Sequence, residues 1–152
     1  MLCITVDNYI KFIYFNGVSQ TIPAGGDDWT QTKCLPLPPA PVQIAVEGAD
    51  VGIVAGMLAS VSDDILLTDS SWKCTKTLYT NWTSNTYNDS AWPGAYVIGL
   101  NGLSPWGVRP GISIRASWIY TANYGQTNAA NSPVYCRRMM RELCSSFNKK
   151  TH

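Results

Sequence analysis

One four-residue phrase, Asp-Ser-x-Trp, occurs twice in the chain, at residues 69–72 and again at residues 89–92. In a turn, Asp and Ser side chains accept hydrogen bonds from backbone amides, and the Trp that follows can enter the space between packed sheets. The surrounding sequence is rich in Gly, Ser, Asn and Thr and shows no long helical pattern before its C-terminal end. These features favour strands joined by turns, in which the two phrases serve as turns and anchors and not as catalytic groups.

Short runs of β-branched and aromatic residues follow one another about every ten residues, with turn signals between them. The runs expected to form strands are residues 4–6, 9–15, 18–22, 42–47, 51–60, 65–68, 72–75, 95–98, 112–121 and 134–139. Asn16-Gly17 stands between two of these runs and predicts a hairpin, because both residues readily take positive φ. Residues 23–41 contain a proline cluster and are expected to form a loop. The pattern predicts an all-β fold, a single antiparallel β-sandwich of the jelly-roll kind with its first and last strands adjacent.

The composition narrows the class of protein. Charged residues make up 14% of the 152-residue chain, whereas globular proteins average about 25%. Six Trp and eight Tyr supply large side chains for one core, so a single domain is expected. The longest apolar run, residues 51–59, is too short to cross a bilayer, and no membrane span is expected.

The charges are unevenly distributed along the chain. Residues 1–136 carry six Lys and Arg against nine Asp and Glu, whereas residues 137–152 carry five Lys and Arg against Glu142. A neutral to acidic body argues against nucleic acid as a partner, which would need a broad basic face. The basic C-terminal segment could contact an anionic glycan or membrane, although a solvated end that frays is the simpler interpretation.

The five cysteines are best explained by disulfide bonds. They are Cys3, Cys34, Cys74, Cys136 and Cys144. None has the spacing of a zinc site, and the only histidine is His152 at the end of the chain. We expect at least one bridge among the first four, with one tying the terminal strand to the body and Cys144 left unpaired. A bridge that closes a long loop would contribute about 3 to 5 kcal/mol to stability.

Disulfides are typical of secreted proteins, so an extracellular location is expected. Two Asn-x-Ser/Thr sequons, at Asn81 and Asn88, are compatible with this location and are the candidate glycosylation sites. Such triplets also arise by chance.

Further phrases occur in the order found in a known fold. The set comprises residues 6–9, 16–17, 28–29, 43–46, 56–59, 68–73, 88–93 and 116–120. Their order resembles the galactose-binding-like β-sandwich, a jelly roll found as non-catalytic modules beside glycoside hydrolase domains and as lectin-like proteins secreted by invertebrates. The resemblance covers roughly residues 3–138, and the domain is expected to span residues 1–138. Residues 139–152 form a basic C-terminal tail, in which Met140, Leu143, Cys144 and Phe147 have the spacing of a short helix.

The resemblance implies that Trp72, Trp92 and Trp118 belong to the framework and that a sugar site would lie on loops at one end of the sandwich. Some members of this fold carry a structural calcium ion near the first strands, and calcium takes six to eight oxygen ligands. The carboxylates that could serve such an ion are Asp7, Asp27, Asp28, Asp63 and Asp64, of which Asp7 and Asp27 are the main candidates. No other cofactor is expected.

Catalysis is not expected. Asp63 and Asp64 are neighbours in the chain and point different ways, whereas glycoside hydrolysis needs two carboxylates that face each other across a bond. The expected domain contains no histidine to act as a base for Ser or Cys. A hydrolase that uses carboxylates alone is the remaining enzymatic alternative.

Two stretches combine an aromatic side chain with hydrogen-bonding groups and with Gly or Pro, as a sugar site requires. The candidates are Asp28 and Trp29 within residues 26–30, and Asn101, Trp106 and Arg109 within residues 101–110. Gly and Pro make the second stretch rigid, which lowers the entropy lost on binding. Alternatively, Trp106 caps the sandwich and Arg109 pairs with a carboxylate.

These residues lead to two functional hypotheses. The first is a secreted, lectin-like carbohydrate-binding protein without catalytic activity, whose partner is a carbohydrate or the glycan of a glycoprotein. The second is a structural or protein-interaction module of an extracellular assembly. In that case the odd cysteine and the basic tail would serve a homo-oligomer or a larger assembly.

Overall fold

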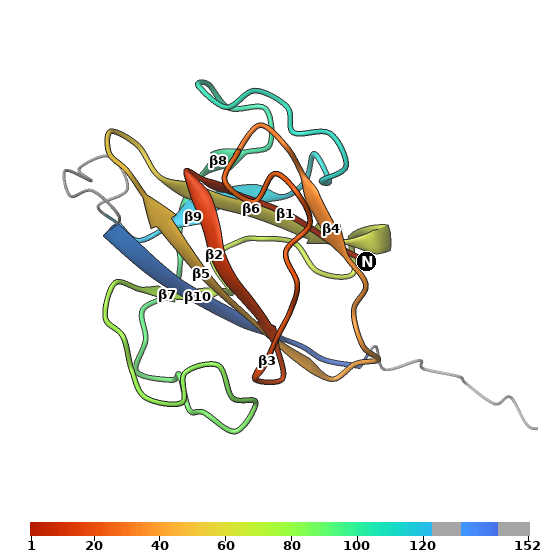
Figure 1. The fold of residues 1–152 in the computed structure, drawn as a ribbon, viewed down its shortest axis with the longest axis vertical. Coiled ribbons are helices and arrows are strands. Elements are labelled where there is room, and N and C mark those ends of the chain that lie inside the picture. Colours follow the sequence, from red (N-terminus) through yellow and green to blue (C-terminus); the bar gives the residue numbers. More distant parts are fainter. Residues whose placement is uncertain (123–131, 143–152) are drawn as a thin grey trace, which may run out of the picture.

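The computed structural model describes residues 1–122 and 132–142, which form an antiparallel β-sandwich (Figure 1). Its strands are β1 (Leu2–Asp7), β2 (Tyr9–Phe15), β3 (Val18–Ser19), β4 (Lys33–Leu35), β5 (Val42–Asp50), β6 (Gly56–Val61), β7 (Lys73–Thr75), β8 (Tyr96–Leu100), β9 (Ser117–Tyr120) and β10 (Ser132–Met140). A 3-10 turn, η1 (Ser62–Asp64), follows β6. The described residues contain no α-helix, and the predicted all-β class is confirmed.

The strands are divided between two five-stranded sheets. The first sheet has the order β4-β1-β6-β9-β8, and the second has the order β3-β2-β5-β10-β7. The prediction that the first and last strands are adjacent is wrong. Strands β4 and β6 occupy both edges of β1, whereas β10 lies between β5 and β7 in the other sheet. The arrangement is compatible with a jelly roll.

The Asn16-Gly17 turn forms as predicted. Asn16 has a φ of 50° and Gly17 a φ of 80°, and β2 pairs with β3 on either side of them. Two positive φ values give the turn a twist that matches the right-handed twist of the flanking strands. The short β3 lies at the edge of the second sheet.

Several strand predictions were wrong. Of the expected strands 18–22, 51–60 and 112–121, only residues 18–19, 56–60 and 117–120 lie in β3, β6 and β9. Strand β4 lies in the segment expected to be a loop, where buried Lys33 and Leu35 alternate with Cys34 opposite β1. The expected strand at residues 65–68 does not form, and Leu67 makes only an isolated bridge to Ser60. Both segments are short, so local composition gave a weak signal compared with the pairing that the sheet offers.

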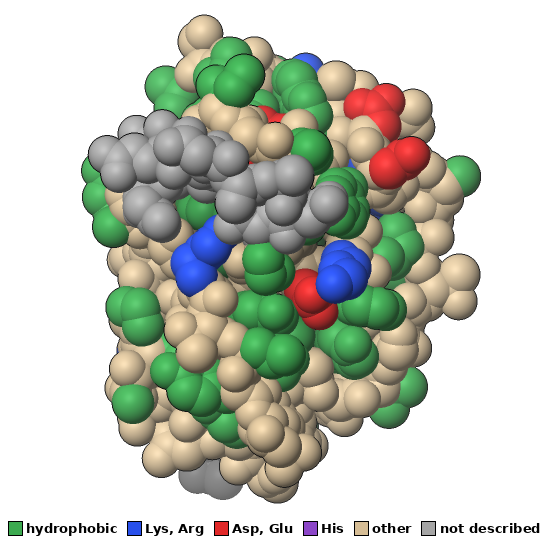
Figure 2. Space-filling view, turned by 60° about the vertical axis from the view of Figure 1, so that its left-hand side comes forward, with side chains coloured by type: hydrophobic (Ala, Val, Ile, Leu, Met, Phe, Trp, Pro, Cys, Tyr) green, Lys and Arg blue, Asp and Glu red, His purple; other side chains and the backbone are tan. Residues whose placement is uncertain are grey.

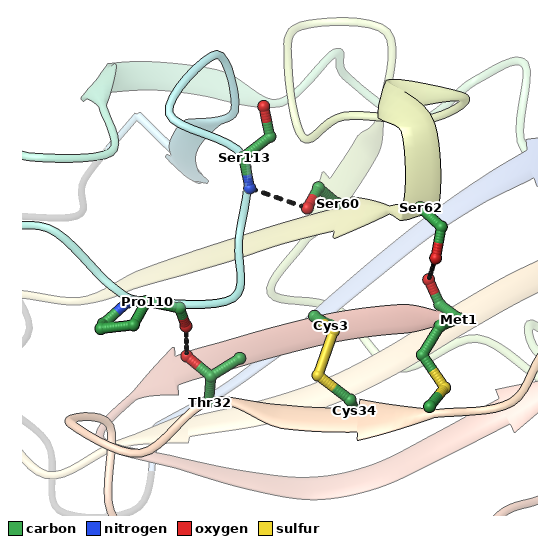
Figure 3. The surroundings of a disulfide bond; sticks show 8 residues. All are labelled: Met1, Cys3, Thr32, Cys34, Ser60, Ser62, Pro110 and Ser113. Atoms are coloured by element: carbon green, nitrogen blue, oxygen red, sulfur yellow. Dashed lines mark hydrogen bonds between the residues drawn. A yellow bond between two sulfur atoms is a disulfide. The ribbon is translucent and has the colours of Figure 1, made fainter.

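Two disulfides join neighbouring strands, and the prediction of at least one bridge among the first four cysteines is confirmed. Cys3–Cys34 links β1 to β4 (Figure 3), and Cys74–Cys136 links β7 to the terminal strand β10. In each pair the two cysteines stand directly opposite each other in the ladder. Cys144 lies outside the described residues.

Among the described residues, three hydrophobic clusters stabilise the sandwich. One lies between the sheets, and the other two lie on the outer faces, where long loops cover them. The inner cluster, between the sheets, includes Ile4, Ile13, Ile44, Met57, Ile119 and Trp72. The cluster on the first sheet contains Leu58, Trp106, Ile112, Ala116 and Trp118. The cluster on the second sheet contains Ala45, Trp82, Trp92 and Tyr135. Successive residues of a strand point to opposite faces, so Leu58 and Ala45 lie outside the inner core that holds their neighbours.

Trp72, Trp92 and Trp118 are all buried, as the framework interpretation expects. Trp72 lies in the inner cluster, whereas the other two lie on the outer faces beneath loops. Each Asp-Ser-x-Trp phrase forms a turn in which the Trp amide donates to the carbonyl of the Asp, Asp69 or Asp89. The two copies therefore serve opposite sides of the second sheet.

Arg137 holds residues 76–94 over the outer face of the second sheet. Its side chain is 1% exposed, and its Nε donates to Asp89 Oδ2 at 2.6 Å. Its Nη atoms donate to the backbone oxygens of Trp82, Ser84 and Tyr87 and to Gln43 Oε1. The guanidinium thus neutralises one carboxylate and satisfies carbonyls of a loop that has no strand of its own.

The surface turned toward the viewer in Figure 2 carries mainly hydrophobic and neutral polar side chains. Charged side chains are few and scattered on this face. Figure 2 agrees with the low charge content of the chain, and no broad basic surface is visible on this face.

Strand β10 continues through Met140, so the first two residues of the expected tail belong to the sheet. Arg141 and Glu142 follow without regular structure. The predicted helical spacing of Leu143, Cys144 and Phe147 lies outside the described residues. Within the described part of the chain, no helix is long and apolar enough to cross a membrane.

Replacing Arg137 by Lys should lower the free energy of unfolding by about 3 kcal/mol or more. One ammonium group cannot satisfy both Asp89 and the loop carbonyls that the guanidinium reaches. Urea denaturation followed by Trp fluorescence measures the loss. Arg138→Lys, at the next position of β10, is the matched control and should change stability by less than about 1 kcal/mol. Equal effects of the two substitutions would contradict the role given to Arg137.

Candidate functional site

The two stretches singled out in the sequence lie side by side at the top of Figure 1. One belongs to the loop between β3 and β4, and the other to the loop between β8 and β9. Arg109 Nη1 donates to Thr30 O at 3.0 Å, and Thr32 Oγ1 donates to Pro110 O at 2.7 Å (Figure 3). The structure thus brings together loops that are almost eighty residues apart in the sequence.

Arg109 lies over the ring of Trp29, with its guanidinium carbon 5.3 Å from the ring centre. Both side chains are half-buried. Trp29 also packs against the outer cluster of the first sheet, so one part of its ring faces protein and another faces solvent. Among the described residues Arg109 has no carboxylate partner, and its Nη2 has no hydrogen-bond acceptor. A guanidinium over an indole is attractive and keeps a donor available at the surface.

Asn101 supports the loop from inside. Its side chain is buried, and its Nδ2 donates to the carbonyls of Arg109, Ile112 and Ser113. Its Oδ1 accepts a hydrogen bond from the Arg109 amide at 2.8 Å. All of its polar capacity is therefore used to fix the backbone around Arg109, and a ligand would not reach it directly.

Trp106 occupies the position described by the capping alternative. It is 2% exposed, and its ring stacks on Trp118 with centres 4.3 Å apart. Its Nε1 donates to Asp7 Oδ2 at 2.8 Å. A sugar could not stack on this ring without unpacking the outer cluster of the first sheet.

Asp28 shapes the first loop. Its Oδ1 accepts hydrogen bonds from the amide and hydroxyl of Thr30, and its Oδ2 accepts one from Gln31 Nε2. The bond from the Thr30 hydroxyl, followed by that from its amide, lowers the pKa of Asp28 from its ordinary value. The neighbouring Asp27 is exposed and is free to face a ligand.

Lys33 lies beneath this loop and was not singled out from the sequence. It is 1% exposed on β4, and its Nζ donates to Asp28 O. Burial lowers the pKa of its ammonium group from the ordinary value, while the nearby Asp28 and Asp27 oppose that change. Lysines in loop segments are normally exposed to solvent, so nothing in the sequence indicated that Lys33 is buried.

Asp7 and Asp27, the calcium candidates, are placed differently. Asp7 is buried at the end of β1, whereas Asp27 is exposed in the first loop. Asp7 lies near Asp50, and three of their four carboxylate oxygens are buried without a hydrogen-bond partner: Asp7 Oδ1 and both oxygens of Asp50. Calcium prefers such oxygens but takes six to eight of them, and the described residues contain no group of three or more His, Cys, Asp or Glu suited to a metal. The donor set fits calcium only if backbone carbonyls and water complete it.

A second polar cluster adjoins these carboxylates. Lys76 Nζ donates to the Tyr120 hydroxyl at 2.9 Å, and the charge of Asp50 acts on both groups. Burial, together with Asp50, raises the pKa of Tyr120. Burial lowers the pKa of Lys76, which Asp50 opposes. The ammonium therefore offsets part of the cost of burying Asp50.

The sequons lie on the loop that Arg137 holds in place. Asn81 and Asn88 are both exposed, and Asn88 Oδ1 accepts a hydrogen bond from the Ser90 amide. Two tyrosines lie on the same loop: Tyr79 is exposed, and Tyr87 packs against Trp92.

Comparison with models of protein families, with curated proteins and with solved structures found no match for this chain. The assignment of function therefore rests on the geometry of the loops.

Asp7→Asn should stabilise the protein more at neutral than at acidic pH. Burial raises the pKa of Asp7 above 3.8, a hydrogen bond from Trp106 opposes the rise, and Asp50 adds to it. The folded state therefore binds more protons than the unfolded state just above pH 3.8, and the contribution of Asp7 to stability falls as pH rises through the raised pKa. Asn keeps an acceptor for Trp106 and carries no charge.

Melting temperatures at pH 4 and pH 7, each with EDTA and with added calcium, measure the effect. Asp27→Asn, which alters an exposed carboxylate, is the control and should show little dependence on pH. A loss of stability in Asp7→Asn at pH 7 that occurs only when calcium is present would instead assign Asp7 to a cation site.

Proposed function

We propose that the protein is a secreted, non-catalytic carbohydrate-binding module with a galactose-binding-like jelly roll. The observation that carries this proposal is the contact of Arg109 with Trp29 and Thr30, which joins two loops into one surface. That surface presents part of an indole ring, a guanidinium Nη2 without an acceptor among the described residues, and the exposed carboxylate of Asp27. Sugars offer apolar C–H faces and hydroxyl groups, which match an aromatic ring flanked by polar groups.

Rigidity also supports this surface as a binding site. Asn101 fixes the backbone of Arg109, Trp106 anchors the same loop, and Asp28 organises the turn beside Trp29. The side chains would therefore lose little conformational entropy on binding. In this proposal Asp28, Asn101 and Trp106 position the groups that touch the ligand, whereas Asp27, Trp29 and Arg109 contact it.

The placement of two carboxylates supports the non-catalytic part of the proposal. Asp7 and Asp50 are close together but almost completely buried. A glycoside hydrolase needs its two carboxylates on either side of a bond in an accessible cleft. Two disulfides and the exposed sequons support the secreted location.

Glycan-array binding, with and without calcium, tests the proposal. Binding to one monosaccharide should be weak, with a Kd on the order of millimolar, since a shallow site buries little of the ligand. Arg109→Ala and Asp27→Asn should each remove most of the signal. Arg115→Ala is the matched control, because Arg115 lies in the same loop, is exposed and pairs with Asp64.

Melting curves accompany each variant, because Arg109 also joins the two loops. Asp27 makes no hydrogen bond within the described residues, so its substitution separates ligand contact from folding. Full binding by a folded Asp27→Asn and a folded Arg109→Ala would refute this surface as the sugar site. Trp106→Ala is uninformative here, since emptying a packed site of this size costs about 3 to 5 kcal/mol of stability.

A second candidate, a protein-interaction module, is favoured by exposed apolar side chains around β8, an edge strand of the first sheet. They are Tyr96, Val97, Leu100, Leu103, Val108 and Ile114, exposed by 46, 41, 58, 39, 56 and 68%. Patches of this kind mark contact surfaces in many proteins. The edge of β8 also carries backbone groups without a neighbouring strand, which a partner could pair.

Sedimentation of the full chain distinguishes this candidate. If the β8 surface forms an assembly, the protein should be an oligomer that Leu100→Lys converts to monomers. Val18→Lys, an equally exposed apolar position on the edge strand β3, is the control and should leave the assembly intact. A monomeric protein at millimolar concentration would exclude the assembly.

A further inference from the structure

A hollow of about 180 Å³ lies where the C-terminal end of β10 extends past β7. Its lining residues are Ser71, Lys73, Asp89, Arg137, Arg138, Met139 and Arg141. Four of them are basic and one is acidic, although residues 1–136 as a whole carry more acidic than basic groups. This concentration of positive charge has no role in the two-loop surface.

The charges within the hollow are not balanced by the protein. The carboxylate of Asp89 is bound by Arg137, whose Nε and Nη atoms are all engaged with protein acceptors. Lys73, Arg138 and Arg141 have no carboxylate within ion-pair distance among the described residues. Three positive charges therefore remain around one small space, where they repel one another.

Several donors face this space without strong partners. Lys73 Nζ makes one long hydrogen bond, 3.3 Å, to Trp92 O and keeps two further protons. Arg138 Nε donates to Ser71 Oγ at 3.1 Å and Nη1 donates to Met139 O, which holds the guanidinium in place and leaves Nη2 without an acceptor in the described part of the chain. Arg141 is exposed and makes no hydrogen bond with the described residues.

The edge of β10 adds backbone groups. Its pairing with β7 ends at Arg137 and Lys73, whereas its pairing with β5 continues to Met140. Among the described residues, no strand pairs with residues 138–140 on the side of β7. The guanidinium of Arg138 and the ammonium of Lys73 beside this strand edge are charged donors of the kind that bind tetrahedral oxyanions, whereas the Ser71 hydroxyl already donates to Asp69 Oδ1.

We propose that this hollow binds the sulfate group of an acidic glycan through Lys73, Arg138 and Arg141. Its volume, roughly that of six water molecules at about 30 Å³ each, accommodates one oxyanion with part of its hydration. The choice of a glycan as the carrier rests on the proposed function. The oxyanion site itself does not depend on it, because it lies in a different part of the fold from Trp29 and Arg109.

Titration of the full chain with sodium sulfate, at ionic strength held constant with sodium chloride, tests the site by amide chemical shifts. Saturable changes should cluster at residues 71–73 and 137–141. Arg138→Gln and Lys73→Gln should each weaken binding at least about tenfold, which corresponds to the loss of one charge-assisted hydrogen bond. Arg115→Gln changes the net charge equally and should bind sulfate as the unmodified protein does.

A sulfated oligosaccharide and its desulfated form then identify the carrier. The sulfated form should bind more tightly than inorganic sulfate, and Arg138→Gln should remove that advantage, whereas Asp27→Asn should not. Shifts spread over the surface, or equal sulfate binding by Arg138→Gln and Arg115→Gln, would overturn the site. Binding to phosphatidylserine vesicles without preference for the sulfated glycan would overturn the carrier, and loss of glycan binding in Asp27→Asn with sulfate binding intact would separate the two surfaces.

Discussion

The arrangement of the candidate sugar site depends on the buried indole of Trp106. Stacked on Trp118 and hydrogen-bonded to Asp7, it fastens the long loop between β8 and β9 to the outer face of the first sheet. The same loop carries Arg109, whose guanidinium lies over the ring of Trp29. Trp106, an aromatic side chain of the kind on which sugars stack, is thus buried as a packing residue. The groups available to a ligand lie a few residues away.

The second sheet uses a different anchor for the same purpose. Its outer face is covered by residues 76–94, and the guanidinium of Arg137 supplies the polar contacts beneath them. The stacked Trp106–Trp118 pair holds the loop between β8 and β9, and the buried Arg137 holds residues 76–94. A loop without strands leaves carbonyl and amide groups to be satisfied. Arg137 does this for residues 76–94, whereas Asn101, within the loop between β8 and β9, does it for the backbone around Arg109.

Much of the fold could be predicted from the sequence, because its signals are local. The Asn16-Gly17 hairpin needs only two residues with positive φ, and runs of β-branched and aromatic residues mark β2 and β5. Strand β4 was missed because three residues after a polar loop carry too little pattern. The adjacency of the first and last strands was also mispredicted, since adjacency is decided by which strand edges remain free.

The candidate site was likewise predictable only where its signals are local. Composition correctly selected two loops that meet, but it could not separate Trp106, which is packed, from Trp29, which is half-buried, since both are Trp beside Gly or Pro. Lys33 and Asp50 were missed because burial of a charge is a property of the assembled sandwich.

Both disulfides have a mechanical consequence of their own. Each one closes a three-residue strand, β4 or β7, onto its neighbour at the outermost position of a sheet. After reduction, β4 and β7 would be held to their sheets by strand pairing over only three residues. The thiol form of the protein would therefore be prone to exchange these strands with other copies of itself.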